Sequence, residues 1–299
     1  MIRHSHLFSG KLKKEVFDMN TSIAMFRERC EKGASRYAKM PPGVTTAATT
    51  IGQMAAEWLI PEQAPEDQAI FYVHGGGYVS GSVNDHRAII AKFAKSTGVK
   101  CLLYEYRLAP EHPYPAALDD SVEAYRWVLA QGFKPASVVV AGESAGGGLA
   151  LALLLALQHN NIPLPAAAVA LSPWTDLTCS GDSYRTKNHR SPAPIDSWHV
   201  FGKHYRADYP ADHPFISPLF GDLKGLPPLL INAGEDDELF DDGRLFAQKA
   251  AEQGVQVVFR AGFRQIHCYP LLAPMFPEAS EAMKEIVTFI KARLEANRQ

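Results

Sequence analysis

The pentapeptide Gly142-Glu143-Ser144-Ala145-Gly146 separates two strongly apolar segments, and it is the feature that most constrains how this chain folds. The β-branched run SVVVA precedes it, and the apolar run GLALALLLALQ follows it. A strand, a sharp turn and a helix in immediate succession hold the central residue in a strained conformation with its side chain exposed at the end of the strand. The helix N-terminus also offers unpaired N–H groups to a developing anion. The segment therefore predicts a nucleophilic serine, Ser144, on a strand-to-helix turn.

Short apolar runs alternate with amphipathic stretches from about residue 70 onward, which is the pattern of successive βα units. Most of these runs show no polar alternation, as expected for parallel strands that are covered on both faces. The predicted strands are Ala69 to Val73, Val99 to Tyr104, Ser137 to Ala141, Ala166 to Leu171, Pro228 to Asn232 and Val255 to Phe259. The chain is therefore predicted to be an α/β protein with a mostly parallel central sheet and helices on both faces.

Two segments do not follow the βα pattern: residues 1 to about 50 and residues about 181 to 214. Both contain large apolar side chains that need burial, among them Phe26, Trp198 and Phe201. We expect these segments to be two parts of one helical cap over the carboxyl edge of the sheet. The whole chain, residues 1–299, is then a single domain with a discontinuous cap.

The second motif with a chemical meaning is His74-Gly75-Gly76-Gly77, which directly follows a predicted strand. Consecutive glycines cost backbone entropy and pack nothing, so they indicate a place where the backbone must approach another group closely. We predict that the N–H groups of Gly76, Gly77 and Ala145 form an oxyanion hole. A phosphate-binding loop is the alternative, but neither G-x-G-x-x-G nor G-x-x-x-x-G-K-[ST] occurs in the chain, which disfavours a nucleotide.

A serine hydroxyl needs a base, and the base needs an acid that orients it. After Ser144, the strand PLLIN leads into Asp236, and the strand VQVVF leads into a turn that ends at His267. We predict that His267 is the general base and Asp236 the orienting acid, in the chain order serine, acid, histidine. Several neighbouring carboxylates leave the choice of acid open: Glu235, Asp237, Glu238, Asp241 and Asp242.

The amino-acid composition restricts which partners this protein is expected to bind. The 30 Lys and Arg residues nearly balance the 32 Asp and Glu residues, for a net charge of −2, so the sequence predicts no nucleic-acid partner and a small uncharged substrate. The longest apolar run, Leu149 to Leu157, is about half of the ~20 residues that a membrane span needs. The N-terminal 20 residues contain no apolar segment typical of a secretory signal, and the four cysteines form no C-x-x-C pair. We therefore expect a cytoplasmic protein that has reduced thiols and no metal site, while a homodimer is left open.

With these motifs in this order, the sequence resembles the bacterial hormone-sensitive-lipase-like esterases (family IV) of the α/β-hydrolase fold. The strings that carry the resemblance are VHGGGYVSGS, YRLAPEHPYPAALDD, AGESAGGGLA, LSPWTDLT and FISPLFGDLKGLPPLLINAGEDDELFDD. They cover most of the chain from residue 70 onward and occur in the order found in that family. The sequence departs from the family at Glu143, where many members have aspartate, and at Asp237-Glu238-Leu239-Phe240, which replaces a common D-P-L continuation.

The resemblance implies a serine carboxylic ester hydrolase with the triad Ser144, Asp236 and His267, an oxyanion hole from Gly76, Gly77 and Ala145, and no cofactor. We expect an acyl-enzyme mechanism on short to medium acyl esters, because the cap should limit the acyl site. A lactone hydrolase with the same triad is one alternative, since SPWTDLT is similar to the segment of members that open lactones. A non-catalytic small-ligand receptor is another, since related plant gibberellin receptors keep the serine but lose the histidine.

Overall fold

The computed structural model describes residues 15–37 and 39–296, and the described residues form one central sheet of eight strands with the order β1-β2-β4-β3-β5-β6-β7-β8. From β4 to β8 all neighbouring strands are parallel, whereas β1 and β2 are antiparallel to their neighbours. The strands are β1 (Val44–Ile51), β2 (Met54–Pro61), β3 (Ala69–Val73), β4 (Cys101–Tyr104), β5 (Val138–Glu143), β6 (Ala167–Leu171), β7 (Leu229–Gly234) and β8 (Val257–Gly262). This confirms the prediction of a mostly parallel α/β fold. All six predicted strands are present, Ala69–Val73 with the predicted ends and the other five with ends shifted by up to three residues.

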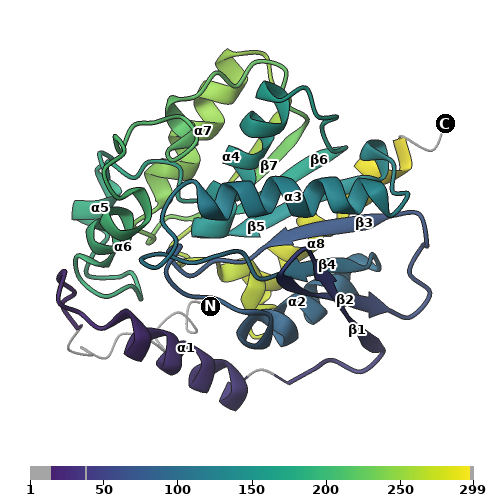
Figure 1. Cartoon of the computed structure of the whole chain (residues 1–299), viewed down its shortest axis with the longest axis horizontal. Helices are drawn as coiled ribbons and strands as arrows, with labels where there is room; N and C mark the ends of the chain where they lie inside the picture. Colours follow the sequence, from purple (N-terminus) through teal and green to yellow (C-terminus); the bar gives the residue numbers. More distant parts are fainter. Residues whose placement is uncertain (1–14, 38, 297–299) are drawn as a thin grey trace.

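Helices cover both faces of the sheet (Figure 1). The α-helices are α1 (Ile23–Tyr37), α2 (Val83–Thr97), α3 (Ala116–Ala130), α4 (Ala145–His159), α5 (Ser183–Thr186), α6 (Ser197–Arg206), α7 (Phe240–Glu252) and α8 (Pro277–Ala296). Three short 3₁₀ helices accompany them: η1 (Pro135–Ser137), η2 (Pro218–Phe220) and η3 (Tyr269–Leu272).

The strands direct alternate side chains into two separate cores, one on each face of the sheet. Along β3, Phe71 and Val73 join the core beneath α3, α4 and α7, while Ile70 and Tyr72 join the core beneath α2 and α8. All the residues of β3 are buried, which explains why its sequence shows no polar alternation. Helices α3 and α8 therefore lie on opposite faces of one sheet.

The N-terminal segment and the insert between β6 and β7 contact each other beside the sheet. Backbone hydrogen bonds of 2.9 Å join Phe17 and Glu15 to the two sides of Ile195. The rings of Phe17 and Phe26 lie 5.7 and 5.3 Å from that of Phe201 on α6. Residues 15–37 and 181–214 thus pack as one unit, near the end toward which the parallel strands run (Figure 1). Residues 1–14 of the predicted cap lie outside the described residues.

The expected boundary of the N-terminal cap segment at about residue 50 is wrong. Residues 44–51 form β1, which pairs along its full length with β2 through a tight turn at Gly52 and Gln53. Gly52 has a φ of +57°, which favours glycine and allows such a short hairpin turn. Residues 44–51 therefore belong to the central sheet and not to the predicted cap segment.

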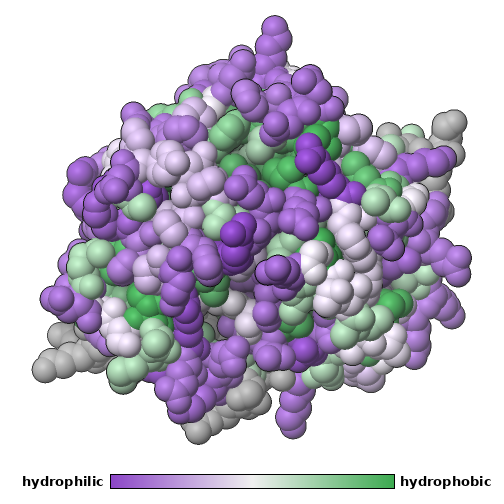
Figure 2. Space-filling model, in the orientation of Figure 1, coloured by the Kyte–Doolittle hydropathy of each residue, from purple (hydrophilic) through white to green (hydrophobic). Residues whose placement is uncertain are grey.

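Hydrophilic side chains dominate the face of the molecule shown in Figure 2, where hydrophobic side chains form small separate groups. Within residues 15–37 and 39–296, no helix has the length and apolar character needed to cross a bilayer. All four cysteines are free thiols.

Candidate active site

Ser144 lies between β5 and α4 in a strained backbone conformation, with φ +56° and ψ −127°. Its N–H donates to the carbonyl of Leu171 at the end of β6, and its carbonyl accepts from the N–H of Trp174. Gly146 permits the sharp turn, because a Cβ at that position would lie 2.2 Å from the carbonyl oxygen of His74. The structure therefore shows the strand, turn and helix that the pentapeptide predicts, with a serine that is buried to 7% exposure.

The glycine loop after β3 lies directly against this turn. A Cβ at Gly75 would lie 3.1 Å from the Cβ of Ser144. The N–H groups of Gly76 and Gly77 donate to no residue of the described chain. Ala145 is the first residue of α4, so its N–H has no partner within the helix. The three predicted donors thus lie in two segments that meet at Ser144.

His267 lies in the loop after β8, and its Nδ1 is 2.8 Å from Oδ2 of Asp237, which follows β7. The Asp237 side chain is fully buried, and its Oδ1 accepts the N–H of Leu239. The two loops are aligned by a backbone hydrogen bond of 2.9 Å from Asp236 to Gln265. Since Nδ1 faces a carboxylate, Nε2 is the ring nitrogen that can act as a base.

Asp236, which the sequence analysis selected as the acid, does not contact His267. Its Oδ1 accepts a hydrogen bond of 2.7 Å from Arg190 and lies 3.8 Å from Nζ of Lys187, both on the insert after β6. Consecutive residues of the turn after β7 direct their side chains to different sides, so Asp236 faces the insert and Asp237 faces His267. The selection of Asp236 as the partner of the histidine is therefore wrong, and the structure places Asp237 there.

The surroundings of His267 alter its acidity. Burial is the largest single influence and lowers the pKa of the imidazole, but the charges and hydrogen bonds of Asp237 and Cys268 together outweigh it and hold this pKa well above its ordinary value. The ring of Trp198 on α6 lies 5.8 Å from the His267 ring and 5.1 Å from that of Trp174. The backbone N–H of Trp174 donates to the Ser144 carbonyl, while its indole N–H donates to the carbonyl of Asp176.

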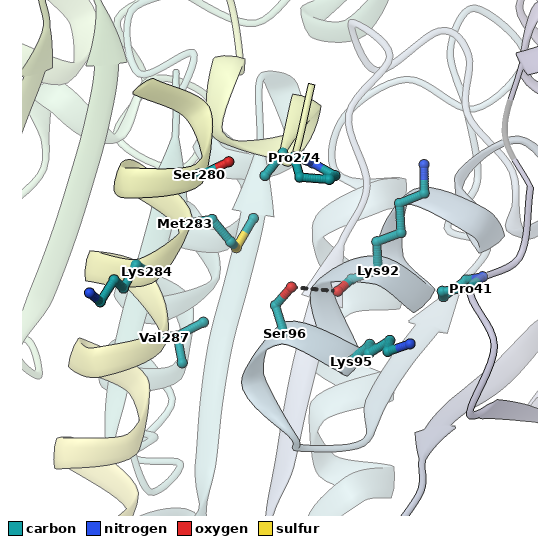
Figure 3. Close-up of a pocket in the computed structure, with 10 residues that line it drawn as sticks. Pro41, Lys92, Lys95, Ser96, Pro274, Ser280, Met283, Lys284 and Val287 are labelled. Atoms are coloured by element: carbon teal, nitrogen blue, oxygen red, sulfur yellow. Dashed lines mark hydrogen bonds between the residues drawn. The ribbon is translucent and has the colours of Figure 1, made fainter. Parts of the chain in front are cut away.

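Two open cavities of the described chain lie away from these residues. The larger cavity, of about 610 Å³, lies between exposed parts of α2 and α8 (Figure 3). Its lining residues are Pro41, Lys92, Lys95, Ser96, Ala273, Pro274, Ser280, Met283, Lys284 and Val287. The other, of about 580 Å³, lies between α3 and Phe215. Neither contains a predicted site residue, and Ser144 lies instead in an enclosed position at the carboxyl ends of the strands.

Two residues of the buried surroundings, Asp85 and His86, carry no sequence signal that connects them to the site. His86 contacts Glu143, the residue before Ser144, although the two are far apart in the chain. Only the fold, which places the start of α2 beside the end of β5, reveals this contact. Asp237 was among the carboxylates left open, but no pattern distinguished it from its neighbours.

Comparisons with known proteins agree with this geometry. A family model of the α/β-hydrolase fold matches residues 70–271. An acetyl-hydrolase of Streptomyces hygroscopicus is 39% identical over 254 residues, which are 84% of this chain and 83% of that protein. An esterase of Acinetobacter venetianus is 38% identical over 233 residues, which are 77% of each chain.

Solved structures show the same likeness over nearly the whole chain. A crystal structure of EstE5 soaked with p-nitrophenyl butyrate has a TM-score of 0.88 and 39% identity, and the match covers 92% of each chain. An esterase from the bacterial hormone-sensitive lipase family has a TM-score of 0.88 and 35% identity, again over 92% of each chain. Together with the placement of Ser144 and the glycine loop, these matches show that the chain belongs to the bacterial hormone-sensitive-lipase-like (family IV) esterases of the α/β-hydrolase fold and is a carboxylesterase.

Proposed function

We propose that the protein hydrolyses carboxylic esters through an acyl-enzyme, with Ser144 as nucleophile, His267 as general base and acid, and Asp237 as the orienting acid. The observation that carries the proposal is the strained Ser144 at the end of β5, at the same sheet edge as a histidine whose Nδ1 faces a buried carboxylate. Because Asp237 engages Nδ1, it fixes the tautomer that leaves Nε2 free to accept the serine proton.

The reaction has two acyl transfers. Ser144 Oγ attacks the ester carbonyl carbon while His267 takes its proton, and the negative oxygen accepts hydrogen bonds from Gly76, Gly77 and Ala145. His267 then returns the proton to the leaving alkoxide as the carbon–oxygen bond of the ester breaks. In the second half, His267 removes a proton from water, whose oxygen attacks the acyl carbon. His267 then gives this proton to Ser144 Oγ as the acyl carbon–Oγ bond breaks, which releases the carboxylic acid.

The substrate is proposed to be a small uncharged ester with a short to medium acyl chain. Residues 15–37 and 181–214 act as the cap, because their aromatic rings close over the glycine loop. Phe201 lies so near this loop that a Cβ on Gly77 would be 2.4 Å from its ring. Such an enclosure favours small acyl groups over long lipid chains.

The test is an ester panel run on the wild type and on Ser144→Ala. The 4-nitrophenyl esters of acetate, butyrate, octanoate and palmitate should give the highest kcat/KM at acetate or butyrate, and Ser144→Ala should lose several orders of magnitude on all four. Ser96→Ala, on the exposed side of α2, is the matched control and should keep wild-type rates. An organophosphate should label Ser144 in the wild type, as detected by peptide mass.

Hydrolysis by Ser144→Ala at the wild-type rate would falsify the proposed nucleophile. A panel that peaks at palmitate would contradict the proposed acyl range. A lactone added to the panel separates the alternative: a higher kcat/KM on the lactone than on every open-chain ester would make the protein a lactone hydrolase with the same triad.

A further inference from the structure

A buried row of charged groups lies beneath the glycine loop and reaches the residue next to Ser144. Oε1 of Glu143 accepts the N–H of Gly75 at 2.6 Å and lies 3.0 Å from Nε2 of His86. The other ring nitrogen of His86 contacts Oδ1 of Asp85. Glu143 and Asp85 are both less than a tenth exposed, so the histidine is held between two buried carboxylates.

The positive charge on His86 offsets the negative charges of Asp85 and Glu143. Burial opposes a positive charge on the ring, but hydrogen bonds to Asp85 and Glu143 and their negative charge raise the pKa of His86 to about 10. Near neutral pH the ring is an imidazolium, and each of its N–H groups donates to a carboxylate. The cation thus holds the Glu143 carboxylate in place, where it accepts from Gly75.

The peptide groups of Gly75 are held on both sides. Its carbonyl lies 2.8 Å from Nδ1 of His74. Burial lowers the pKa of His74 to about 4, so this ring is neutral and donates from Nδ1. The His74 ring stacks on Tyr106 with centroids 4.2 Å apart, and the Tyr106 hydroxyl donates to the His74 carbonyl at 2.8 Å. With its N–H and its C=O both engaged, Gly75 has little freedom to rotate.

Fixing Gly75 also fixes the two residues that follow it. Gly76 and Gly77 continue the same loop, and their N–H groups have no partner among the described residues. On its other side, Gly75 packs against Ser144 itself. Glu143 therefore links the loop that carries two oxyanion donors to the residue that attacks the substrate.

We propose that Glu143 is a positioning residue for the oxyanion hole: its carboxylate, held by His86, ties Gly75 to the nucleophile turn and so sets where the Gly76 and Gly77 amides lie relative to Ser144 Oγ. This inference rests on the proposed function. It predicts that loss of the contact with Gly75 destabilises the transition state more than the bound substrate, because the oxyanion forms only as the serine attacks.

Glu143→Gln tests the proposal, because it keeps the size of the side chain and removes its charge. Removal of one oxyanion donor typically costs about 10²–10³ in kcat, so a displaced pair of donors should lower kcat by at least about 10-fold with KM changed less than about threefold. A trifluoromethyl ketone forms a tetrahedral oxyanion adduct with the serine. Its inhibition constant should weaken by the same factor as kcat/KM, which a merely structural role would not produce.

Glu57→Gln is the matched control. Glu57 is another buried glutamate, 7% exposed, that pairs with Arg87 on α2 at 2.6 Å and lies on β2, away from the glycine loop. It should change thermal stability without changing kcat or the inhibition constant. If Glu143→Gln is insoluble, His86→Gln decides, because it removes the cation that holds the carboxylate and should give the same kcat-specific loss.

The proposal is wrong if soluble Glu143→Gln, or His86→Gln in its place, keeps kcat and ketone inhibition within about twofold of wild type. It is also wrong if substrate KM rises as much as kcat/KM falls. Failure of the proposed function looks different, since an organophosphate would then leave Ser144 unlabelled in the wild type. In Glu143→Gln we expect labelling at Ser144 to proceed, at a lower rate.

Discussion

Two consecutive carboxylates, Asp236 and Asp237, have entirely different partners. Asp237 is fully buried and faces His267, whereas Asp236 is paired with Arg190 and Lys187 of the insert. A buried carboxylate beside the histidine both orients the ring and stabilises the imidazolium that forms during attack. Asp236 instead ties the turn after β7 to the insert after β6.

Replacing each of these two residues by asparagine should separate their roles. Asp237→Asn removes the charge that raises the His267 pKa and allows the wrong tautomer, so kcat should fall by about 10³–10⁴. Because the base must be neutral, kcat/KM rises as the pH rises through the His267 pKa, and in Asp237→Asn this rise should move to lower pH.

Asp236→Asn, as the control, should keep kcat within about tenfold and leave the pH profile in place. Profiles of kcat/KM against pH for the three proteins provide the measurement, and an unshifted profile in Asp237→Asn would contradict the assignment.

The sequence could predict that Ser144 and His267 lie at one edge of the sheet, but not which carboxylate faces the histidine, for a physical reason. Ser144 is marked by its strand, turn and helix, and His267 by its place after the last strand, so topology alone brings them to one edge. The acid lies in a turn where Asp236 and Asp237 both follow the same strand. Which of the two faces the histidine depends on the turn's backbone dihedrals and on the cations of the insert, and neither is visible in a local pattern.

At the scale of elements, Arg27 attaches α1 to the segments that follow the glycine loop. Arg27 donates from Nε to the carbonyl of Val79 at 2.6 Å and from Nη2 to the carbonyl of Ala109 at 2.8 Å, and it also pairs with Glu111. Hydrogen bonds from a charged donor contribute about 1.5–3 kcal/mol each, whereas an exposed ion pair contributes about 0–1 kcal/mol. The two backbone contacts therefore matter more than the pair with Glu111.

Arg27→Ala should loosen α1 and open the acyl side of the site. We expect faster proteolytic cleavage within residues 15–37 and a several-fold increase in the octanoate-to-acetate ratio of kcat/KM. Arg29→Ala is the matched control, because Arg29 lies on the same helix and its one ion pair within residues 15–37 and 39–296 is with the half-exposed Glu15. Limited proteolysis and the ester panel measure both effects. If the Arg27 and Arg29 variants behave alike, α1 does not restrict the acyl group through this contact.

The strands that could be predicted from the sequence and the β1–β2 hairpin that could not differ mostly in burial. Five of the six parallel strands are fully buried, and the edge strand β8, although partly exposed, still begins with Val257, Val258 and Phe259, so each strand has an apolar signal. The hairpin of β1 and β2 lies at the edge of the sheet, and the Thr- and Ala-rich β1 is largely exposed, with no apolar face to detect. Its pairing comes from the backbone and the turn at Gly52, which is why these residues were placed in the cap.

For the molecule as a whole, the two buried histidines of the glycine-loop region make stability depend on pH in opposite directions. The pKa of His86 rises from 6.5 to about 10 on folding, so its contribution is complete below pH 6.5 and is lost as the pH rises through 10. The pKa of His74 falls from 6.5 to about 4, so protonation of the unfolded chain reduces stability as the pH falls from 6.5 to 4. These two groups together favour a maximum of stability near pH 6.5.

Urea unfolding midpoints between pH 5 and 10 test this dependence. The wild type should lose stability steadily above pH 6.5, while His86→Gln should be less stable near neutral pH and show a flatter alkaline side. His112→Gln, at an exposed position, serves as the control and should follow the wild type. Parallel curves for His86→Gln and the wild type would show that His86 does not carry the alkaline dependence.

The strained backbone of Ser144 lowers the stability of the folded chain at the residue proposed to carry out the reaction. Its φ of +56° with ψ of −127° is a conformation that glycine reaches far more easily than serine, so the folded chain holds strain at this residue. A glycine there would relax the backbone but remove the hydroxyl of the proposed nucleophile. Stability and the proposed reaction therefore favour different amino acids at position 144.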